Sequence, residues 1–502
     1  MIALTGLVAL AGCAKPMHET PAVMVKSAQF EIFSTMSPEE TKALALELER
    51  FHALIYATTN APAVSAVVPT RIYAFARKSE YKKYGPPDTA GVFVESMRDN
   101  TILLADYSST IPASEVILHE YVHFVLRNAA TRRYPIWYDE GFAEFLSTAR
   151  SYGEDQIALG AFPRSNLAAF ENVKWVPLRR VIAAKSYDDL KGRDAFMLYP
   201  ESWALVHYLF LDRESTGTPV SEEIAEYLSQ TDQGVVPHVA FESAFGETTD
   251  SASRNIQRIL ERRKLRVIAV PVESLDFDET EPSVRSLSQA ETAFHLAGLT
   301  FRKGDLEKAE QAYRFAIAGD PNNARAHVGL GDSLKYQERF EEGQVAFDRA
   351  IELDSENALN QLDYAEFLDE RARQTPLGDE RTAFFEAARK AFKRSHELDP
   401  STPETLAMHG MSYVAEGEKA AMGYPMVAEA LKMMPANVEL MGRMAEASLA
   451  VGRETEAREL LVRLFSVRGK GGPAKNAEKR IEAIKKNWAE ERAIARGENP
   501  EE

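Results

Sequence analysis

Residues 319–357 read GDPNNARAHVGLGDSLKYQERFEEGQVAFDRAIELDSEN, and this stretch begins and ends on the same motif. Gly319-Asp320-Pro321-Asn322-Asn323 recurs 34 residues later as Leu353-Asp354-Ser355-Glu356-Asn357. A third copy, Leu398-Asp399-Pro400, follows an insertion near residues 374–382 that is expected to form a loop. A fixed period of this length is typical of repeated helix pairs. The C-terminal half is therefore expected to be an all-α stack of helix pairs.

Small and aromatic residues recur at the same period, since Ala309, Tyr313 and Ala316 correspond to Gly343, Phe347 and Ala350. A period of 34 residues identifies tetratricopeptide repeats, and we expect four to five of them over residues 288–470. Residues 471–502 are expected to add a charged capping helix and a tail. Such stacks form a concave surface that binds peptides or proteins. We expect the repeats to bind a substrate or partner, with packing on the N-terminal half as the alternative.

The N-terminal half combines predicted strands with helices. Alternating apolar and polar residues, bounded by turn residues, predict strands over residues 29–34, 71–77, 91–95 and 101–105. Helical patterns follow at residues 112–127 and 140–149, and residues 160–266 are mostly helical in pattern. Residues 267–287 are rich in acidic residues and prolines without a helical pattern, and we expect them to form a linker. The fold class is therefore α+β, followed by the all-α repeats.

His119-Glu120-Tyr121-Val122-His123 lies inside one of the predicted helices. Two histidines four residues apart lie on one face of a helix, one turn apart, and can share a metal ion. The neighbouring residues are apolar, so these polar side chains would be buried, and a bound metal would offset the cost of burial. The single cysteine of the chain is Cys13, so thiolates cannot complete a zinc site here.

A catalytic zinc ion takes three protein ligands and keeps one position open. The segment WYDEGFAEF, residues 137–145, offers Glu140 as the preferred third ligand and Asp139 as the competing one. Glu140 is preferred because Glu144 then lies one turn further on the same helix face, where it can accept a hydrogen bond from an imidazole. Gly141 has no side chain and is expected to let this helix lie close to the HEYVH helix.

HEYVH followed by WYDEGFAEF resembles the gluzincin zinc peptidases, the group that contains thermolysin and the zinc aminopeptidases. The wider pattern over residues 24–266 resembles the peptidase MA-like domains of bacterial envelope proteins. The resemblance implies one zinc ion per chain, held by His119, His123 and Glu140, with Glu120 as the general base. In that mechanism zinc lowers the pKa of a water molecule, Glu120 takes its proton, and a peptide bond is hydrolysed.

Two further roles follow from this resemblance. A tyrosine or histidine from a later helix often stabilises the oxyanion, and Tyr199 is the candidate, with a purely structural tyrosine as an equal alternative. An edge strand before the HExxH helix pairs with the substrate, which would assign this role to Thr101–Ala105, with an ordinary sheet strand as the alternative. His207 lies in a strongly apolar helix and is expected to be a hydrogen-bonded core histidine.

Residues 1–12 (MIALTGLVALAG) are apolar and uncharged, and Cys13 follows them. This arrangement resembles a bacterial lipoprotein signal peptide, in which the cysteine is lipidated, although no Lys or Arg precedes the apolar run. Residues 13–23 would then be a lipidated tether. The resemblance implies a periplasm-facing lipoprotein of the bacterial cell envelope, at the outer membrane rather than the inner one because Ala14 follows the cysteine. A chance cysteine after an apolar segment is the alternative.

The net charge of −17 repels phosphate backbones and argues against a nucleic-acid partner. The main prediction is a membrane-anchored, zinc-dependent peptidase that hydrolyses envelope proteins or peptides. The alternative is a non-enzymatic envelope scaffold or assembly lipoprotein that acts through its repeats. Glu120 favours the enzyme, because a structural metal site needs only ligands and hydrolysis also needs a base. An aminopeptidase is a weaker option, since no motif to bind a free N-terminus is present.

Overall fold

The computed structural model describes residues 17–59, 70–87, 89, 91–94, 96–98, 100–105, 113–129, 134–153, 155–163, 169–170, 173–184, 189–213, 218–262, 265–276, 280–435, 437–468 and 473–495. The predicted signal peptide and Cys13 lie outside these residues, so the lipid anchor stays a prediction. Within the described ranges, no helix combines the length and the apolar character needed to cross a membrane.

A six-stranded sheet forms the centre of the N-terminal half, with the strand order β4-β5-β3-β2-β1-β9. Its strands are β1 (Val23–Lys26), β2 (Phe30–Ser34), β3 (Thr70–Phe75), β4 (Gly91–Val94), β5 (Asn100–Ala105) and β9 (Ser283–Ser286). β2, β3 and β5 are parallel, whereas β1, β4 and β9 run antiparallel to their neighbours. The four predicted strands are present, and β1 and β9 extend the sheet beyond the prediction.

Residues 101–105 do not form the edge strand that the resemblance implied; the alternative, an ordinary strand of the sheet, is confirmed. β5 lies between β4 and β3, and each of these neighbours pairs with it. β4 stands at the end of the strand order instead, so its outer side is the edge of the sheet. The sequence pattern could not distinguish the two strands, because both are short apolar runs between turns.

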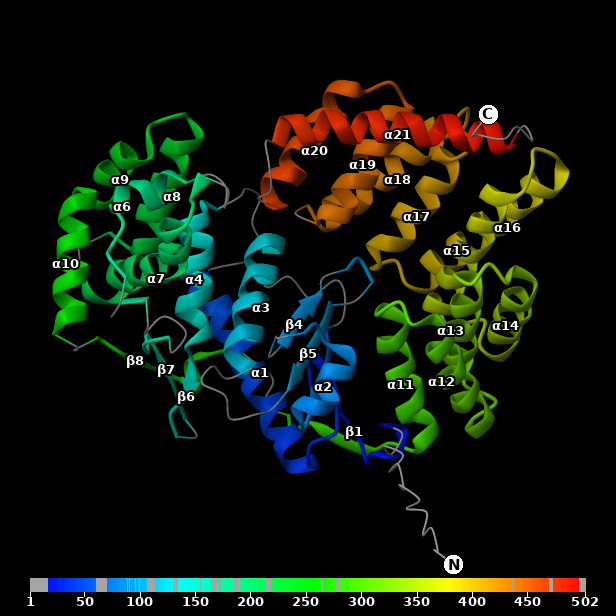
Figure 1. Ribbon diagram of the computed structural model, residues 1–502, viewed down its shortest axis with the longest axis horizontal. Coiled ribbons are helices and arrows are strands. Elements are labelled where there is room, and N and C mark those ends of the chain that lie inside the picture. The colour runs from blue at the N-terminus through cyan, green and yellow to red at the C-terminus, as the bar shows by residue number, and fades with distance from the viewer. Residues whose placement is uncertain are drawn as a thin grey trace, which may run out of the picture.

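Helices cover both faces of this sheet. On one face, alternate residues such as Ile32, Ile72 and Ile102 form a core with α1 (Pro38–Thr59) and α3 (Ala113–Ala129). On the other face, their neighbours Phe33, Phe75 and Leu103 pack with Tyr81 of α2 (Lys78–Tyr84) and with Leu296 and Leu299 of α11 (Gln289–Arg302). Figure 1 shows α11, the first helix of the repeats, beside the sheet, and the cluster of side chains means that the sheet and the solenoid share a hydrophobic core.

A helical layer beside α3 completes the N-terminal half (Figure 1). It comprises α4 (Ile136–Ser147), α6 (Leu178–Ala183), α7 (Arg193–His207), the π-helical turn η4 (Tyr208–Asp212), α8 (Val220–Asp232), α9 (Pro237–Phe245) and α10 (Thr249–Glu261). The helix that was expected to begin at Glu140 begins four residues earlier, because Pro135 stands at its N-cap and fixes the backbone there.

The linker expected at residues 267–287 contains two strands rather than a free tether. β8 (Ile268–Pro271) pairs with β7 (Gln156–Leu159), which also pairs with β6 (Arg150–Ser151) to form a small second sheet. β9 pairs with β1 at the end of the main sheet. Most side chains of β8 and β9 are exposed, so neither strand shows the apolar alternation that identifies a strand in a sequence.

The C-terminal half is a solenoid of helix pairs over residues 289–468 (Figure 1). The pairs are α11 with α12 (Leu306–Gly319), α13 (Ala324–Lys335) with α14 (Phe340–Leu353), α15 (Ala358–Gln374) with α16 (Asp379–Leu398), α17 (Pro403–Val414) with α18 (Ala420–Met433), and α19 (Val438–Ala450) with α20 (Glu454–Arg468). The first helices of successive pairs contact one another, which puts them on the inner, concave side. The charged helix α21 (Pro473–Ala495) packs on α20, as a capping helix would.

The insertion in the third repeat does not form the expected loop. It lengthens α15 and α16 to 17 and 20 residues, whereas α13 and α14 have 12 and 14. The segments on either side, residues 364–373 and 383–394, are rich in alanine, arginine and glutamate, and these residues favour helix over loop. The third helix pair is therefore longer than its neighbours.

The shared core predicts that the two halves stabilise each other. We expect Leu299→Ala, at a side chain 3% exposed against the sheet, to lower the free energy of unfolding by about 2–5 kcal/mol. Guanidinium unfolding can be followed by tryptophan emission, which reports mainly on Trp137, Trp175 and Trp203 of the N-terminal half, and by circular dichroism, which reports on the repeats. Both transitions should shift. The exposed Leu377→Ala should change stability by less than about 0.5 kcal/mol, and a shift confined to circular dichroism would contradict the shared core.

Candidate metal centre

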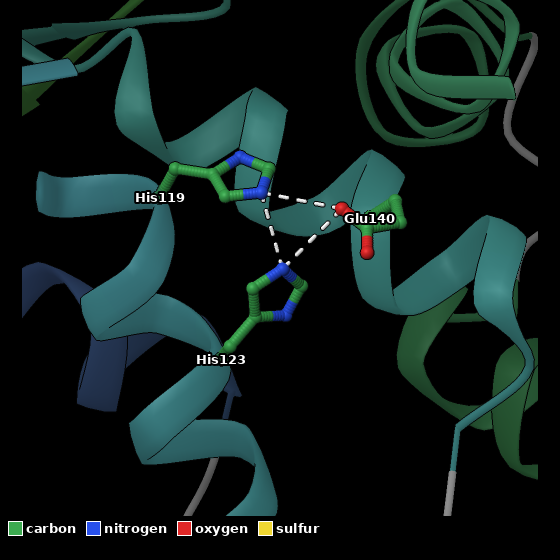
Figure 2. Close-up of side chains that lie close together, drawn as sticks. All are labelled: His119, His123 and Glu140. Carbon is green, nitrogen blue, oxygen red and sulfur yellow. Dashed lines mark hydrogen bonds and ion pairs between the residues drawn. The ribbon is translucent and has the colours of Figure 1, made fainter. Parts of the chain in front are cut away.

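Two adjacent helices bring three potential metal ligands together. His119 and His123 lie one turn apart on α3, and Glu140 faces them from α4 (Figure 2). The two imidazole Nε2 atoms are 3.1 Å apart, and they lie 3.2 Å and 3.3 Å from Glu140 Oε2. The predicted ligands therefore meet at one point, and their nearest atoms form an almost equilateral triangle.

This triangle has the size that a tetrahedral zinc ion requires. Zinc bonds to imidazole nitrogen and carboxylate oxygen are about 2.0–2.2 Å long, so two ligands of a tetrahedral ion are about 3.4 Å apart. The observed separations of 3.1–3.3 Å agree with this value to within a few tenths of an ångström. Two histidines and one glutamate are also the ligand set of known catalytic zinc sites with an open position. The residues present therefore fit zinc.

Two further carboxylates face the outer nitrogens of the imidazoles. Asp139 Oδ1 lies 3.0 Å from His123 Nδ1, within hydrogen-bond distance. Glu144 Oε1 lies 3.7 Å from His119 Nδ1, as predicted for its place on the helix but too far for a direct hydrogen bond. Asp139, the competing third ligand, instead takes the orienting role on the second histidine. The position of Asp139 directly before Glu140 was the only sign of this contact in the sequence, where it indicates a rival metal ligand rather than a hydrogen-bond partner of His123.

The carboxylates around the imidazoles stabilise positive charge at this site. Burial lowers the pKa of His123, but the charges and hydrogen bonds of Asp139 and Glu140 outweigh burial and raise this pKa to about 10. Burial raises the pKa of Glu140, but hydrogen bonds from His119 and His123 hold it well below its usual range. A divalent cation among the three ligand atoms would supply the positive charge that the two carboxylates stabilise.

Tyr199 lies beside the same cluster. It belongs to α7, and its ring centroid is 6.2 Å from that of His119. Burial raises the pKa of Tyr199, and the negative charges of Glu140, Glu120 and nearby carboxylates raise it further above its ordinary value. The hydroxyl therefore stays protonated at neutral pH and can donate a hydrogen bond. Glu120 is partly buried, and it lies close enough to Tyr199 for its negative charge to raise the pKa of the tyrosine.

Gly141 permits a close helix contact, although with a different helix from the one expected. A Cβ atom at this position would lie 2.3 Å from the carbonyl oxygen of Ser202 on α7. The missing side chain therefore lets α4 approach α7, not α3. Since Tyr199 is one turn before Ser202, this contact helps to place the tyrosine beside His119. The glycine was evident in the sequence, but the sequence does not show which neighbouring helix it faces.

His207 is a satisfied core residue, as predicted. Its Nε2 lies 3.0 Å from the carbonyl oxygen of Gly160 and 3.1 Å from that of Arg266, and its Nδ1 lies 2.8 Å from Asp212 Oδ2. Its exposed fraction is 1%. The fully occupied imidazole nitrogens leave His207 no place in the metal centre.

Comparison with known proteins supports the repeats. Residues 324–357 match the tetratricopeptide repeat family. No curated protein matches the chain. Matching solved structures include PilF from Pseudomonas aeruginosa, with 20% identity over 41% of this chain and 86% of that one, at a TM-score of 0.32. A thermophilic tetratricopeptide protein from Thermus thermophilus has 14% identity over 40% of this chain and 98% of that one, at a TM-score of 0.33. The type IV pilus biogenesis factor PilW has 16% identity over 39% of this chain and 92% of that one, at a TM-score of 0.31.

The geometry predicts one zinc ion per chain. Atomic spectroscopy of the purified protein should find about one zinc in the native sequence and in Glu120→Gln, because the glutamine replaces no ligand. His123→Ala should lose most of the metal, whereas His327→Ala, at a half-buried histidine of the repeats, should keep it. If the native chain takes up no zinc even after reloading, the assignment of the metal centre is wrong.

The two outer carboxylates should differ in their effect on zinc affinity. Asp139→Ala removes a hydrogen-bond partner 3.0 Å from a ligand imidazole and should weaken zinc binding about 10–100-fold. Glu144→Ala removes a carboxylate at 3.7 Å and should weaken binding less. Competition with a chromogenic chelator measures both constants. A larger loss for Glu144→Ala than for Asp139→Ala would contradict the orientation seen here.

Proposed function

We propose that the chain is a zinc-dependent peptidase of the gluzincin type, whose repeats bind a protein substrate or partner. The observation that carries the proposal is the triangle of His119, His123 and Glu140 ligand atoms, sized for tetrahedral zinc. Glu120 and Tyr199 lie next to it, where hydrolysis needs a base and a hydrogen-bond donor. The resemblance to peptidase MA-like domains supports the same chemistry.

Each of the two further residues has a distinct task in this proposal. A zinc ion bound to the three ligands would polarise a substrate carbonyl and acidify a water molecule. The Glu120 carboxylate accepts the proton of the attacking water and returns it to the leaving amine. The Tyr199 hydroxyl, kept protonated by burial and the surrounding carboxylates, donates a hydrogen bond to the developing oxyanion.

The sheet offers a place for an extended substrate. β4 ends the strand order, and within the described residues no strand pairs with its outer side. It also lies against the ligand-bearing helix, because a Cβ atom at Gly91 would be 2.7 Å from Ile117 Cδ1 of α3. A peptide could add to this edge as a further strand and run past the metal centre. We therefore transfer the substrate-pairing role from residues 101–105 to β4.

The second candidate is a non-enzymatic scaffold that acts through its repeats. The match of residues 324–357 to the tetratricopeptide family favours it, because such repeats commonly bind proteins and need no hydrolysis to do so. In either case we propose an envelope location, with a lipid anchor at Cys13 and the outer membrane rather than the inner one. The two candidates differ in one measurable property, which is turnover of peptide bonds.

The enzyme proposal predicts a separation of metal binding from hydrolysis. With fluorescein-labelled casein as an unfolded test protein, the zinc-loaded native chain should release fluorescent peptides. Glu120→Gln should lower the rate about 10²–10⁴-fold without loss of zinc, because only the base is removed. Tyr199→Phe should lower kcat about 10²-fold with little change in KM, since the hydroxyl acts on the oxyanion.

The matched control is Tyr152→Phe, which removes the hydroxyl of an exposed tyrosine and should leave the rate unchanged. Zinc-loaded native protein that cleaves neither casein nor a mixture of synthetic peptides would favour the scaffold. Equal rates for the native chain and Glu120→Gln would also contradict the proposal, because the cleavage would then come from a contaminant.

A further inference from the structure

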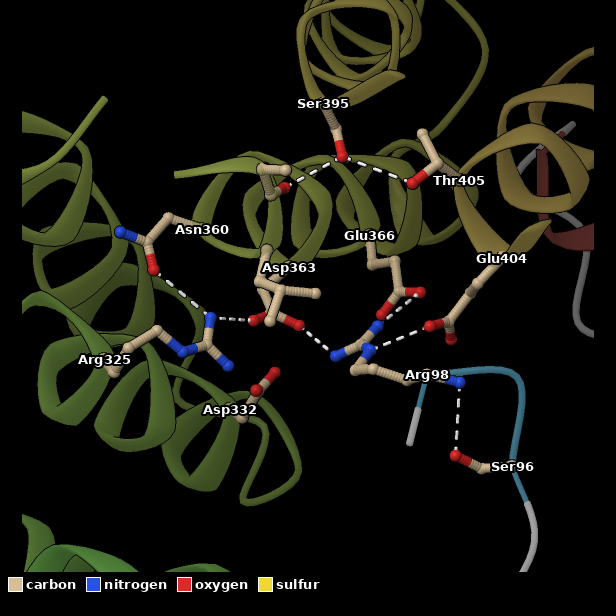
Figure 3. Close-up of polar contacts among 12 residues, drawn as sticks. Ser96, Arg98, Arg325, Asp332, Asn360, Asp363, Glu366, Ser395, Glu404 and Thr405 are labelled. Carbon is tan, nitrogen blue, oxygen red and sulfur yellow. Dashed lines mark hydrogen bonds and ion pairs between the residues drawn. The ribbon is translucent and has the colours of Figure 1, made fainter. Parts of the chain in front are cut away.

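The concave side of the repeats holds a piece of the N-terminal half. The turn between β4 and β5 projects into the solenoid, and its residue Arg98 lies among three carboxylates of the inner helices (Figure 3). Arg98 Nη2 is 3.0 Å from Glu366 Oε1 and Arg98 Nε is 2.8 Å from Glu404 Oε2. A further ion pair joins Arg98 Nη1 to Asp363 Oδ1. One arginine thus connects α15 and α17 of two successive repeats.

The residue before this arginine fills an apolar hollow. Met97 is 1% exposed and packs in one cluster with Ala407 of α17, Ala430 of α18, Met434 just after α18, and Leu440 of α19. The groove therefore contacts two adjacent side chains of different kinds. One subsite is apolar and takes an unbranched chain, and the other is acidic and takes a guanidinium group.

The repeats themselves carry more negative than positive charge at this place. Asp332, Asp363, Glu366 and Glu404 contribute four carboxylates, whereas the repeats contribute two cations, Arg325 and Lys335. Burial, together with the negative charges of Glu404 and Asp363, raises the pKa of Glu366 to about 7, although the positive charge of Arg98 lowers it. Asp363 is only 2% exposed, so its charge needs buried cations, and Arg325 of the repeats pairs with it at 2.5 Å. Arg98, from the turn between β4 and β5, adds a second positive charge to a cluster in which carboxylates outnumber the cations of the repeats.

We propose that this groove is a binding site for a protein segment with an arginine next to a long apolar side chain, and that Met97 and Arg98 are an internal ligand that occupies it. A partner that presents such a segment competes with Met97 and Arg98, which form the tip of the hairpin of β4 and β5. Tetratricopeptide grooves bind extended peptides on the same inner helices, so the internal ligand takes the place of an external one. The proposal does not depend on peptide hydrolysis at the metal centre.

Displacement of the tip has a structural consequence near the metal ligands. β4 and β5 are held together in the register Val92 with Leu103 and Phe93 with Ile102. The Phe93 ring lies 6.4 Å from that of Tyr121 and 5.6 Å from that of Phe124, both on α3. β4 is thus fixed at one end by the groove and along its length by β5 and α3. Displacement of Met97 and Arg98 from the groove removes the constraint at this end of β4, and the contacts of β4 with β5 and α3 remain.

The test uses a fluorescent peptide with the sequence of residues 93–102, FVESMRDNTI. Its binding to the full chain is measured by fluorescence anisotropy in the native sequence and in Arg98→Ala. The variant should bind the peptide about tenfold more tightly or better, because the internal ligand no longer competes for the groove. The same peptide with glutamine in place of its arginine should bind at least about tenfold more weakly to Arg98→Ala.

The matched control is Arg339→Ala, which removes an arginine that pairs with Glu310 and Glu342 at 2.8 Å and 2.7 Å outside the groove. It should bind the peptide no better than the native chain. Hydrogen exchange of the native chain with excess peptide gives an independent measurement that needs no variant. The amides of residues 91–94 should lose protection, because the tip is displaced. Equal binding of the arginine and glutamine peptides, or no binding to either protein and unchanged protection, would overturn the proposal.

Discussion

The central sheet must bury both of its faces, and the rest of the structure depends on this constraint. Alternate side chains of β2, β3 and β5 are large and apolar on each face, so each needs a helical cover. One face receives α1 and α3, which fixes the helix that carries His119 and His123. The other receives α2 and α11, which fixes the start of the solenoid. The metal centre and the concave groove are therefore oriented relative to each other through a single sheet.

Two clusters of carboxylates in this chain are largely buried, and burial of a negative charge is costly without a nearby cation. The two clusters obtain the positive charge in different ways. At the candidate metal centre, Asp139 and Glu140 face imidazoles, whose positive charge can be exchanged for a metal ion. In the groove, Asp363 and its neighbours face Arg98, whose guanidinium is always charged and comes from the other half of the chain. Buried carboxylates need nearby cations, and in each cluster part of that charge comes from outside the local residues. At the histidines a metal ion would supply it, and in the groove Arg98 adds to Arg325 of the repeats.

The sequence predicted local features better than the pairing of distant ones. The HEYVH helix and the helix pairs follow from spacing, because the two histidines and the repeats each have a fixed helical period. The choice of Glu140 over Asp139 depended instead on the position of Glu144 and on the resemblance to gluzincins. Three features depend on tertiary partners: the edge position of β4, the contact of Gly141 with α7, and the strands inside residues 267–287. Neither IAVP in β8 nor SVRS in β9 shows a sustained alternation of apolar and polar residues. Arg98 and Met97 resembled ordinary turn residues, because nothing near them in sequence shows the carboxylates more than 260 residues away.

β4 connects these two parts of the molecule. Four residues in extended conformation span about 13 Å, so the distance between the groove and the HEYVH helix is covered by one short, paired strand. Its glycine, Gly91, admits Ile117 of α3 at a separation where any side chain would clash, and its other end continues into the turn that Arg98 anchors. If displacement of Arg98 from the groove shifts β4, the contacts of this strand with α3 must change as well. A ligand that binds the groove only when Arg98 is displaced would then be coupled to the helix that carries two of the three metal ligands.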